Sequence, residues 1–128
     1  MTAPGVQGIT NPMMIYKIFR AGEWAALRDN GQTAGAPIDI ADGYVHFSTA
    51  AQAAQTAAKH FAGEKDLMLL AVETERLADD LKWEKSRGDQ LFPHLYRALQ
   101  MGDVSWAQPL PLKGGMHQFP AGLEDAST

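Results

Sequence analysis

The sequence contains no cysteine among its 128 residues. This absence excludes a disulfide framework, a thiolate metal site and a cysteine nucleophile. No apolar run approaches the roughly 20 residues that a membrane helix requires, since the longest extends only from Leu67 to Val72. We therefore expect no membrane association and a cytoplasmic location.

Basic residues are also scarce. Eleven lysines and arginines stand against 15 acids, which gives a formal net charge of -4. Binding to a phosphate backbone needs a basic surface, so nucleic acid is not an expected partner. The four histidines lack the i, i+3 or i, i+4 spacing of a helical metal pair, and no metal site is expected. Glycine-rich dinucleotide and phosphate loops and the hydrolase nucleophile elbow are missing as well.

What remains is an ordinary globular composition, with 45% hydrophobic and 20% charged residues. A chain of this length normally forms one domain, which we place at residues 13–120. Residues 1–12 carry neither the basic nor the apolar region of a secretory signal, and we interpret them as a flexible lead-in. Residues 121–128 are interpreted as a frayed tail.

The hydrophobic pattern predicts alternating strands and helices in the first half and mostly strands in the second. Strands are expected over 13–19, 43–48, 67–72, 81–84, 92–99 and 104–112. Helices are expected over 23–31 and 50–62, with one helical turn within 74–80, and residues 32–42 are expected to form a surface connector. This order favours an α+β fold with a largely antiparallel sheet and two main helices.

Two of these elements carry more specific signals. Ala54, Ala57, Ala58 and Phe61 fall on one face of the second helix, and we expect that face to pack against the sheet. Proline cannot complete the hydrogen bonds of a central strand, so the strand over 104–112, which contains Pro109, is expected at a sheet edge.

His46 lies in an apolar strand that ends at Ser48 and Thr49. Thr49 stands three residues before Gln52, the spacing of a capping box, so a helix is expected to begin there. Helix N-termini attract anions, which makes this junction a candidate anion site. The alternative is a buried histidine bonded to backbone beside an ordinary helix cap. The residues alone leave both interpretations open.

A second cluster combines an acid, an imidazole and a phenol. It consists of Trp83 and Glu84 followed by His94 and Tyr96. Large aromatic side chains beside polar groups often line pockets. The alternative is a small aromatic core beneath the 86–90 loop, with Glu84 exposed to solvent.

Four separated segments resemble a bacterial family called domain of unknown function 952. These segments are Ile15-Tyr16-Lys17-Ile18, Asp42 to Ala50, Trp83-Glu84 and Phe92-Pro93-His94-Leu95-Tyr96. They occur in the order of the family and span about Met13 to Pro120. Members of this family are similar in fold to the ADP-ribosyltransferases, which bind NAD in a cleft between two small sheets. The resemblance thus implies an ADP-ribosyltransferase-like fold whose small, mostly antiparallel sheets form a cleft with two main helices.

The same resemblance implies roles for particular residues. Lys17 takes the place of the residue that holds the nicotinamide ribose, and His46 or Phe47 faces the nicotinamide. Glu84 is the candidate for the glutamate that stabilises the oxocarbenium-like transition state. The implied catalytic residues are therefore His46 and Glu84. The implied ligand-binding residues are Lys17, Ser48, Thr49, Trp83, His94 and Tyr96.

Three functions follow as hypotheses. The first is an enzyme that transfers ADP-ribosyl groups or cleaves NAD, the one cofactor that the resemblance implies. The second is a small-molecule-binding module without catalysis, and the third is a structural domain whose aromatic residues are core. An RNA 2'-phosphate-removing activity is disfavoured by the scarcity of arginine. If the site exists, Lys17, His46, Ser48 and His94 or Tyr96 should converge on one cleft.

Overall fold

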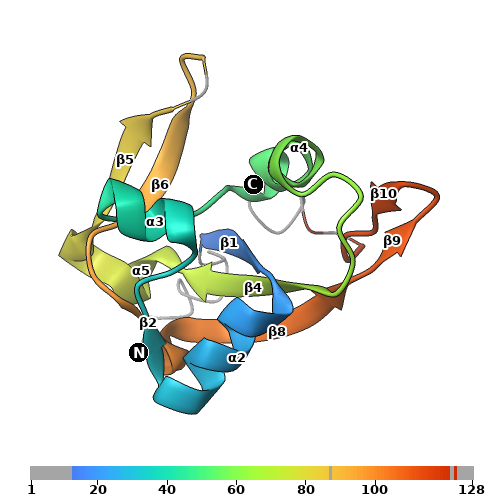
Figure 1. The fold of residues 1–128 in the computed structure, drawn as a ribbon. Coiled ribbons are helices and arrows are strands. Elements are labelled where there is room, and N and C mark those ends of the chain that lie inside the picture. The colour runs from blue at the N-terminus through green and yellow to red at the C-terminus, as the bar shows by residue number, and fades with distance from the viewer. Residues whose placement is uncertain (1–12, 87, 122, 124–128) are drawn as a thin grey trace, which may run out of the picture.

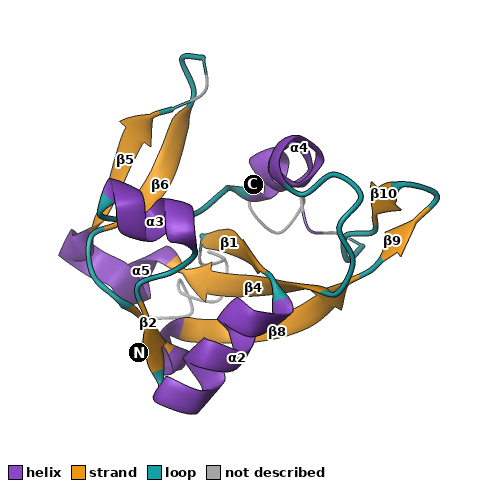
Figure 2. Cartoon of the chain, in the orientation of Figure 1, coloured by secondary structure: helices purple, strands orange, loops and turns teal. Residues whose placement is uncertain are grey.

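The computed structural model describes residues 13–86, 88–121 and 123 and shows a mixed α+β fold (Figures 1 and 2). Two three-stranded antiparallel sheets form its framework, with strand orders β1-β4-β8 and β3-β6-β5. The sequence-based α+β prediction with small antiparallel sheets is confirmed. The predicted lead-in over 1–12 lies outside the described residues, as does the predicted tail over 121–128 except for positions 121 and 123.

The first sheet holds the centre of the core. Its strands are β1 (Met14–Phe19), β4 (Leu67–Glu73) and β8 (Val104–Leu110). The apolar run of β4 is buried because this strand lies between the other two and has packed side chains on both faces. β8 lies at the edge, as Pro109 predicts. β1 forms the opposite edge and alternates its side chains between the two faces, so that Ile15 and Phe19 join one core cluster and Tyr16 and Ile18 the other.

Two longer helices flank this sheet in Figure 1: α2 (Ala21–Asn30) and α4 (Ala50–His60). α2 ends at Gly31, whose φ of 78° provides the left-handed exit that its sequence predicts. α4 buries Ala50, Ala53 and Ala57. Of the residues predicted to face the sheet, Ala57 is buried and Phe61 packs against the core, whereas Ala54 and Ala58 are exposed.

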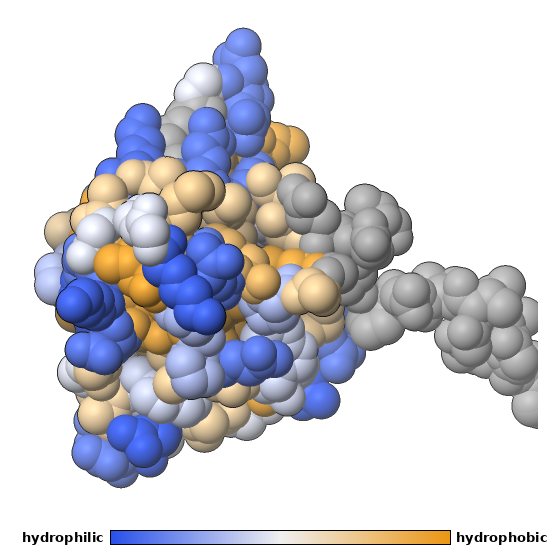
Figure 3. Space-filling model, turned by 90° about the vertical axis from the view of Figure 1, so that its right-hand side faces the viewer, coloured by the Kyte–Doolittle hydropathy of each residue, from blue (hydrophilic) through white to orange (hydrophobic). Residues whose placement is uncertain are grey.

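The second sheet contains β3 (Val45–His46), β6 (Leu91–Leu95) and β5 (Leu81–Lys85). After β3 the chain crosses to the first sheet, where the backbones of Ser48 and Tyr16 exchange hydrogen bonds of 2.7 and 2.9 Å. The two sheets therefore meet at one residue pair, beyond which their edges diverge. The β5–β6 hairpin projects from the body in Figure 1, and its end, at the top of Figure 3, is hydrophilic.

The segment predicted as a surface connector is instead structured. It contains β2 (Gln32–Thr33), which pairs with β7 (Leu99–Gln100), and the short helix α3 (Pro37–Asp42). Pro37 occupies the first turn of α3, and Gly43 leaves it with a φ of 87°. The prediction was wrong because β2 is only two residues long and α3 only six, so neither produces a detectable period.

The remaining elements are short. α5 (Thr74–Leu77) and a 3₁₀ turn over Ala78–Asp80 connect β4 to β5, and a second 3₁₀ turn over Met101–Asp103 precedes β8. β9 (Leu112–Lys113) and β10 (Met116–His117) form a terminal hairpin. Within the described part of the chain, no helix has both the length and the apolar character needed to cross a membrane.

Candidate functional site

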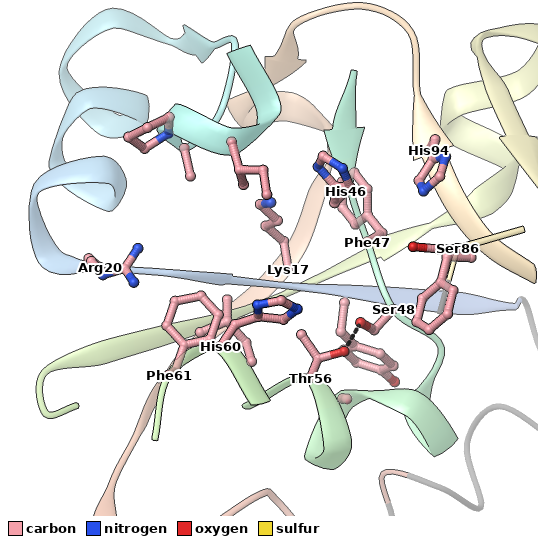
Figure 4. A pocket seen from close by; sticks show the side chains of 17 residues that line it. Lys17, Arg20, His46, Phe47, Ser48, Thr56, His60, Phe61, Ser86 and His94 are labelled. Atoms are coloured by element: carbon pink, nitrogen blue, oxygen red, sulfur yellow. Dashed lines mark hydrogen bonds between the residues drawn. The ribbon is translucent and has the colours of Figure 1, made fainter. Parts of the chain in front are cut away.

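A pocket of about 380 Å³ lies where the two sheets diverge. It is bounded by the β1 edge strand, by the start of α3, by the segment from His46 to Ser48, by one face of α4 and by the β5–β6 hairpin. Figure 4 shows side chains from all of these elements pointing towards one space. Segments far apart in the sequence therefore contribute to one pocket, whose volume is within the range of small-molecule sites.

Lys17 on β1 forms a buried ion pair with Asp39 on α3. Its Nζ lies 2.8 Å from Asp39 Oδ2, and the two side chains are 8% and 0% exposed. Burial lowers the pKa of the Lys17 ammonium, and the Asp39 carboxylate opposes this shift. Figure 4 shows Lys17 rising from β1 towards α3. The pair thus links the two elements and brings a cation to the pocket lining.

Asp39 also accepts several other hydrogen bonds. Its carboxylate oxygens accept from the backbone N–H groups of Ala36 at 2.7 Å and His46 at 3.0 Å, and from His46 Nδ1 at 2.5 Å. Burial alone would raise the pKa of Asp39, but the hydrogen bonds from His46 and the charge of Lys17 outweigh it and lower the pKa. Asp39 is consequently a buried anion with a full set of partners.

Gly35 makes room for this carboxylate. Its φ is 104°, and a Cβ added there would lie 2.3 Å from Asp39 Oδ2. A side chain at position 35 would therefore collide with the carboxylate and impose an unfavourable backbone conformation. Gly35 and Pro37 thus shape the turn that places Asp39 against His46 of β3.

His46 lies between two carboxylates. Nδ1 contacts Asp39, and Nε2 lies 2.9 Å from Asp42 Oδ2. Carboxylates only accept hydrogen bonds, so both contacts are hydrogen bonds when both ring nitrogens carry protons. The His46 side chain is 26% exposed and lines the pocket. Its ring nitrogens are nevertheless already engaged.

His94 lies directly opposite His46 in the β3–β6 ladder. Its Nδ1 lies 2.8 Å from Glu84 Oε1, and the same oxygen accepts a 2.7 Å hydrogen bond from the Tyr96 hydroxyl. The hydrogen bonds from Tyr96 and then from His94 lower the pKa of Glu84, while Glu84 raises the pKa of Tyr96 to about 12. Glu84 is therefore an ionised acceptor at neutral pH.

The other ring nitrogen of His94 is unusual. Nε2 is buried and has no hydrogen-bond partner among the described residues. Leaving a buried polar atom without a partner costs about 1–3 kcal/mol, so such an atom requires a specific explanation. The ring of His94 is part of the pocket lining, and Figure 4 shows it on the side where Ser48 and Ser86 lie.

Tyr44 joins the two histidines into one aromatic group. Its ring stacks on His94 with centroids 4.2 Å apart and lies 4.7 Å from His46 and 5.0 Å from Tyr96. The rings of His46 and His94 are 5.2 Å apart and nearly perpendicular. Burial and the nearby acids Asp42 and Glu84 raise the pKa of Tyr44. The stack fixes the orientation of both imidazoles.

The opposite wall comes from α4 and the end of β1. Ser48 Oγ and Thr56 Oγ1 lie 2.8 Å apart, the contact drawn as a dashed line in Figure 4. His60, Phe61 and Arg20 complete this side. The Arg20 guanidinium lies 4.7 Å from the Phe61 ring centroid and forms hydrogen bonds of 2.8 and 2.9 Å with Glu64.

The charge distribution of the lining differs from that of the whole chain. Lys17, Arg20 and three imidazoles line the pocket, and no described lining residue is an aspartate or glutamate. The carboxylates that pair with Lys17, Arg20, His46 and His94 are not among the described lining residues. Among the residues that the structure describes, no three histidine or acidic side chains are arranged to hold a metal ion.

The structure brings together only part of the predicted site. Lys17, His46, Ser48 and His94 all line the pocket, whereas Glu84, Thr49, Trp83 and Tyr96 do not. Glu84 and Tyr96 lie behind His94, and the Trp83 side chain is exposed. The roles of all these residues in ligand binding or catalysis remain predictions.

Thr49 has the capping role that its spacing predicts. Its hydroxyl accepts from the Gln52 N–H at 3.3 Å, and Gln52 Oε1 accepts from the Thr49 N–H at 3.0 Å. The predicted cap is therefore confirmed, and it uses the Gln52 N–H. The structure gives Thr49 a position in the cap and not in the pocket lining.

Sequence reasoning missed Asp39, Asp42, Arg20 and Thr56. Asp39 lay in the segment interpreted as a connector, although Gly35 and Pro37 mark a defined turn beside it. Thr56 lines the pocket through its contact with Ser48, which no local sequence pattern indicates. No sequence signal connects Arg20 with the pocket.

Three comparisons place the chain among known proteins. Residues 18–107 match the family model described as "Protein of unknown function (DUF952)". A crystal structure of protein CC0527 from Caulobacter crescentus is 48% identical with a TM-score of 0.80, and the alignment covers 83% of this chain and 94% of that one. A solution NMR structure of CC0527 is also 48% identical, with a TM-score of 0.75 and coverage of 82% and 91%. No curated protein matches. The chain therefore belongs to the DUF952 family.

Proposed function

We propose that the pocket binds a small anionic ligand built on a phosphorylated ribose, such as ADP-ribose or NAD. One observation carries this proposal: two cationic side chains and three imidazoles line the pocket without any carboxylate among the described lining residues, in a chain of net charge -4. Such a local excess of donors and positive charge favours an anion, and phosphate is a common anion in small metabolites.

The other lining groups support the rest of the ligand. Phe47, Phe61 and Phe92 supply aromatic surface, and Ser48 and Thr56 supply hydroxyl groups. Aromatic faces stack on planar rings such as a nucleobase or nicotinamide, and hydroxyl groups bond to sugar. A volume of about 380 Å³ is near the lower end of the range for small-molecule sites. It suits one nucleotide-sized part of NAD better than the entire dinucleotide.

The arrangement of two small sheets around a pocket also supports the ADP-ribosyltransferase-like interpretation. Transfer of an ADP-ribosyl group or cleavage of NAD requires a group that stabilises positive charge developing on the ribose. Glu84, the candidate for that role, accepts hydrogen bonds from His94 and Tyr96 and is not part of the lining. The site therefore supports binding more directly than catalysis, and the proposal is limited to binding.

A structural role for the polar cluster is the second candidate function. Lys17 and Arg20 each have a carboxylate partner, at 2.8 Å in both cases. In this alternative the Lys17, Asp39 and His46 network only joins α3 to β1 and β3. The two candidates differ in what they predict for the addition of ligand.

Calorimetric titration of the protein with ADP-ribose, NAD, ribose 5-phosphate and inorganic phosphate tests the proposal. We expect ADP-ribose to bind more tightly than inorganic phosphate, because it also uses the aromatic and hydroxyl groups. Arg20→Gln should weaken binding by about tenfold, through loss of a charge-assisted hydrogen bond. Arg76→Gln is the matched control, since Arg76 is an exposed arginine outside the pocket. No binding of any of these compounds at millimolar concentration would favour the structural role.

A further inference from the structure

We propose that His94 is the specificity-determining residue of the pocket: its Nε2 accepts a hydrogen bond from a ligand hydroxyl, so the site selects ligands that carry this hydroxyl. Glu84 is the positioning residue that keeps Nε2 an acceptor. This inference rests on the proposed function and adds to it the class of ligand group that the buried side of the pocket recognises.

The geometry around Glu84 determines which nitrogen of the neutral His94 ring carries the proton. Glu84 Oε1 lies 2.8 Å from Nδ1 and also accepts from the Tyr96 hydroxyl, so this oxygen acts as an acceptor towards both neighbours. Nδ1 must then carry the proton. In a neutral imidazole the other nitrogen holds a lone pair and can only accept. Glu84 therefore determines the chemistry at the far side of the ring.

The position of Nε2 makes this acceptor selective. The His94 side chain is 3% exposed, and Nε2 has no partner among the described residues. The ring is held by stacking on Tyr44 at 4.2 Å and cannot easily turn away. A site built around a buried polar group rejects analogues that leave it unpaired by as much as about 10⁴-fold, far more than an apolar contact achieves.

The two histidines also orient the ligand. The lone pair on Nε2 of a neutral His94 ring repels an anionic oxygen. Lys17, which lines the same pocket, attracts one. The His46 ring, which lies beside Lys17 through their common partner Asp39, is 5.2 Å from the His94 ring. The phosphate should therefore lie on the Lys17 side and a hydroxyl on the His94 side. A ribose phosphate carries both groups.

The first test needs no ligand and no variant. Long-range ¹H–¹⁵N NMR of the histidine side chains distinguishes the Nδ1–H tautomer, the Nε2–H tautomer and the doubly protonated ring. It is recorded at about pH 8, where an ordinary imidazole is neutral. We expect the Nδ1–H tautomer for His94. A dominant Nε2–H tautomer or a doubly protonated ring would overturn the inference.

The second test measures selectivity. ADP-ribose is compared with analogues that lack one ribose hydroxyl each, removed one at a time. We expect one of these deletions to weaken binding by about 100-fold or more, with a smaller effect from the others. Equal affinity for ADP-ribose and all of its deoxy analogues would overturn the role of His94 while leaving the proposed function intact. No binding of ADP-ribose would overturn both.

The third test measures the effect of Glu84 on the His94 tautomer and uses Tyr96→Phe as the control. Glu84→Gln replaces the carboxylate with an amide that donates as well as accepts, so part of the His94 population should become Nε2–H and the selectivity should fall at least several-fold. Tyr96→Phe removes the other partner of Glu84 and leaves the Glu84–His94 contact in place. It should preserve both the tautomer and the selectivity. Unchanged tautomer and selectivity in Glu84→Gln would overturn the positioning role.

Discussion

His46 and His94 face each other across one strand pair, and each has a carboxylate at Nδ1. Their other nitrogens differ. Nε2 of His46 contacts Asp42, whereas Nε2 of His94 is buried with no partner among the described residues. One ring is thus closed into a network, and the other has an unused hydrogen-bonding position towards the pocket. This difference is the basis for proposing a structural role for His46 and a ligand-recognition role for His94.

The carboxylates at the two Nδ1 atoms also differ, because they come from different elements. Asp39 comes from α3, which packs over β3 and buries its side chain completely. Glu84 comes from the projecting β5–β6 hairpin, and its side chain is 39% exposed. A buried carboxylate requires several partners and therefore gathers Lys17 and two backbone N–H groups. The partly exposed Glu84 carboxylate accepts from the imidazole of His94 and the hydroxyl of Tyr96.

The largest effect on stability should come from disrupting the network of Lys17, Asp39 and His46. Asp39→Asn leaves Lys17 as a buried cation without its counter-charge and weakens the contacts with His46. Breaking a buried ion pair from one side costs about 3–5 kcal/mol, so the free energy of unfolding should fall by that amount. Urea denaturation followed by tryptophan fluorescence measures it. Glu84→Gln, on the exposed side of the comparison, should cost far less, and equal losses in the two variants would contradict the distinction.

Protonation of Asp39 at low pH should weaken the same network in the wild-type protein. The pKa of Asp39 is lower in the folded protein than the value of about 3.9 for an unperturbed aspartate. Its ionised form therefore stabilises the fold fully above about pH 4, and this contribution is lost as the pH falls through the folded pKa. The stability difference between wild type and Asp39→Asn should shrink over this range. A difference that stays constant down to pH 2 would show that Asp39 ionisation contributes nothing.

A smaller effect is expected at the N-terminus of α4, the helix that lines one side of the pocket. Thr49→Ala removes the side-chain acceptor of the capping box and should lower the free energy of unfolding by about 1 kcal/mol. Thermal unfolding measures the change. Thr49→Ser retains the hydroxyl and serves as the control. Since Thr49 does not line the pocket, ligand affinity should change little, and a large loss of affinity in Thr49→Ala would restore the anion site proposed from sequence.

The smallest effect on stability is expected at Tyr96. Tyr96→Phe removes an exposed hydrogen bond to Glu84 and should leave the unfolding free energy nearly unchanged. The sensitive observable is ionisation, because Glu84 raises the pKa of Tyr96 to about 12. Ultraviolet titration of Glu84→Gln should show one tyrosine that ionises closer to pH 10. An unchanged titration would mean that this carboxylate does not contact the phenol in solution.

The sequence predicted those parts of the fold that have a regular pattern. The glycine exit of α2 and the Thr49 cap each depend on contacts within a few residues, and the continuous apolar run of β4 indicates a buried strand. The register of α4 was less certain, because alanine occurs on every face and Ala53, instead of Ala54, packs inward. α3 and β2 are too short to show a period.

The strand residues of the site could be predicted from the sequence, but their ion pairs and hydrogen bonds with other elements could not. Lys17, His46 and His94 stood out because they interrupt apolar strands. Asp39 and Arg20 acquire their roles only through packing against elements distant in sequence, such as the 2.8 Å contact between Lys17 and Asp39. The contact of Glu84 with His94, outside the described pocket lining, likewise follows only from the pairing of β5 with β6.

We propose that Nε2 of His94 binds the ligand, whereas both ring nitrogens of His46 keep their contacts with Asp39 and Asp42. The most direct test is a titration of wild-type protein with ADP-ribose, followed by ¹H–¹⁵N NMR of both imidazole rings in the same sample. The account predicts a large change at His94 Nε2 as it gains a hydrogen bond, and small changes at the ring nitrogens of His46. Saturable binding that leaves His94 Nε2 unchanged, or that changes His46 more than His94, would contradict it.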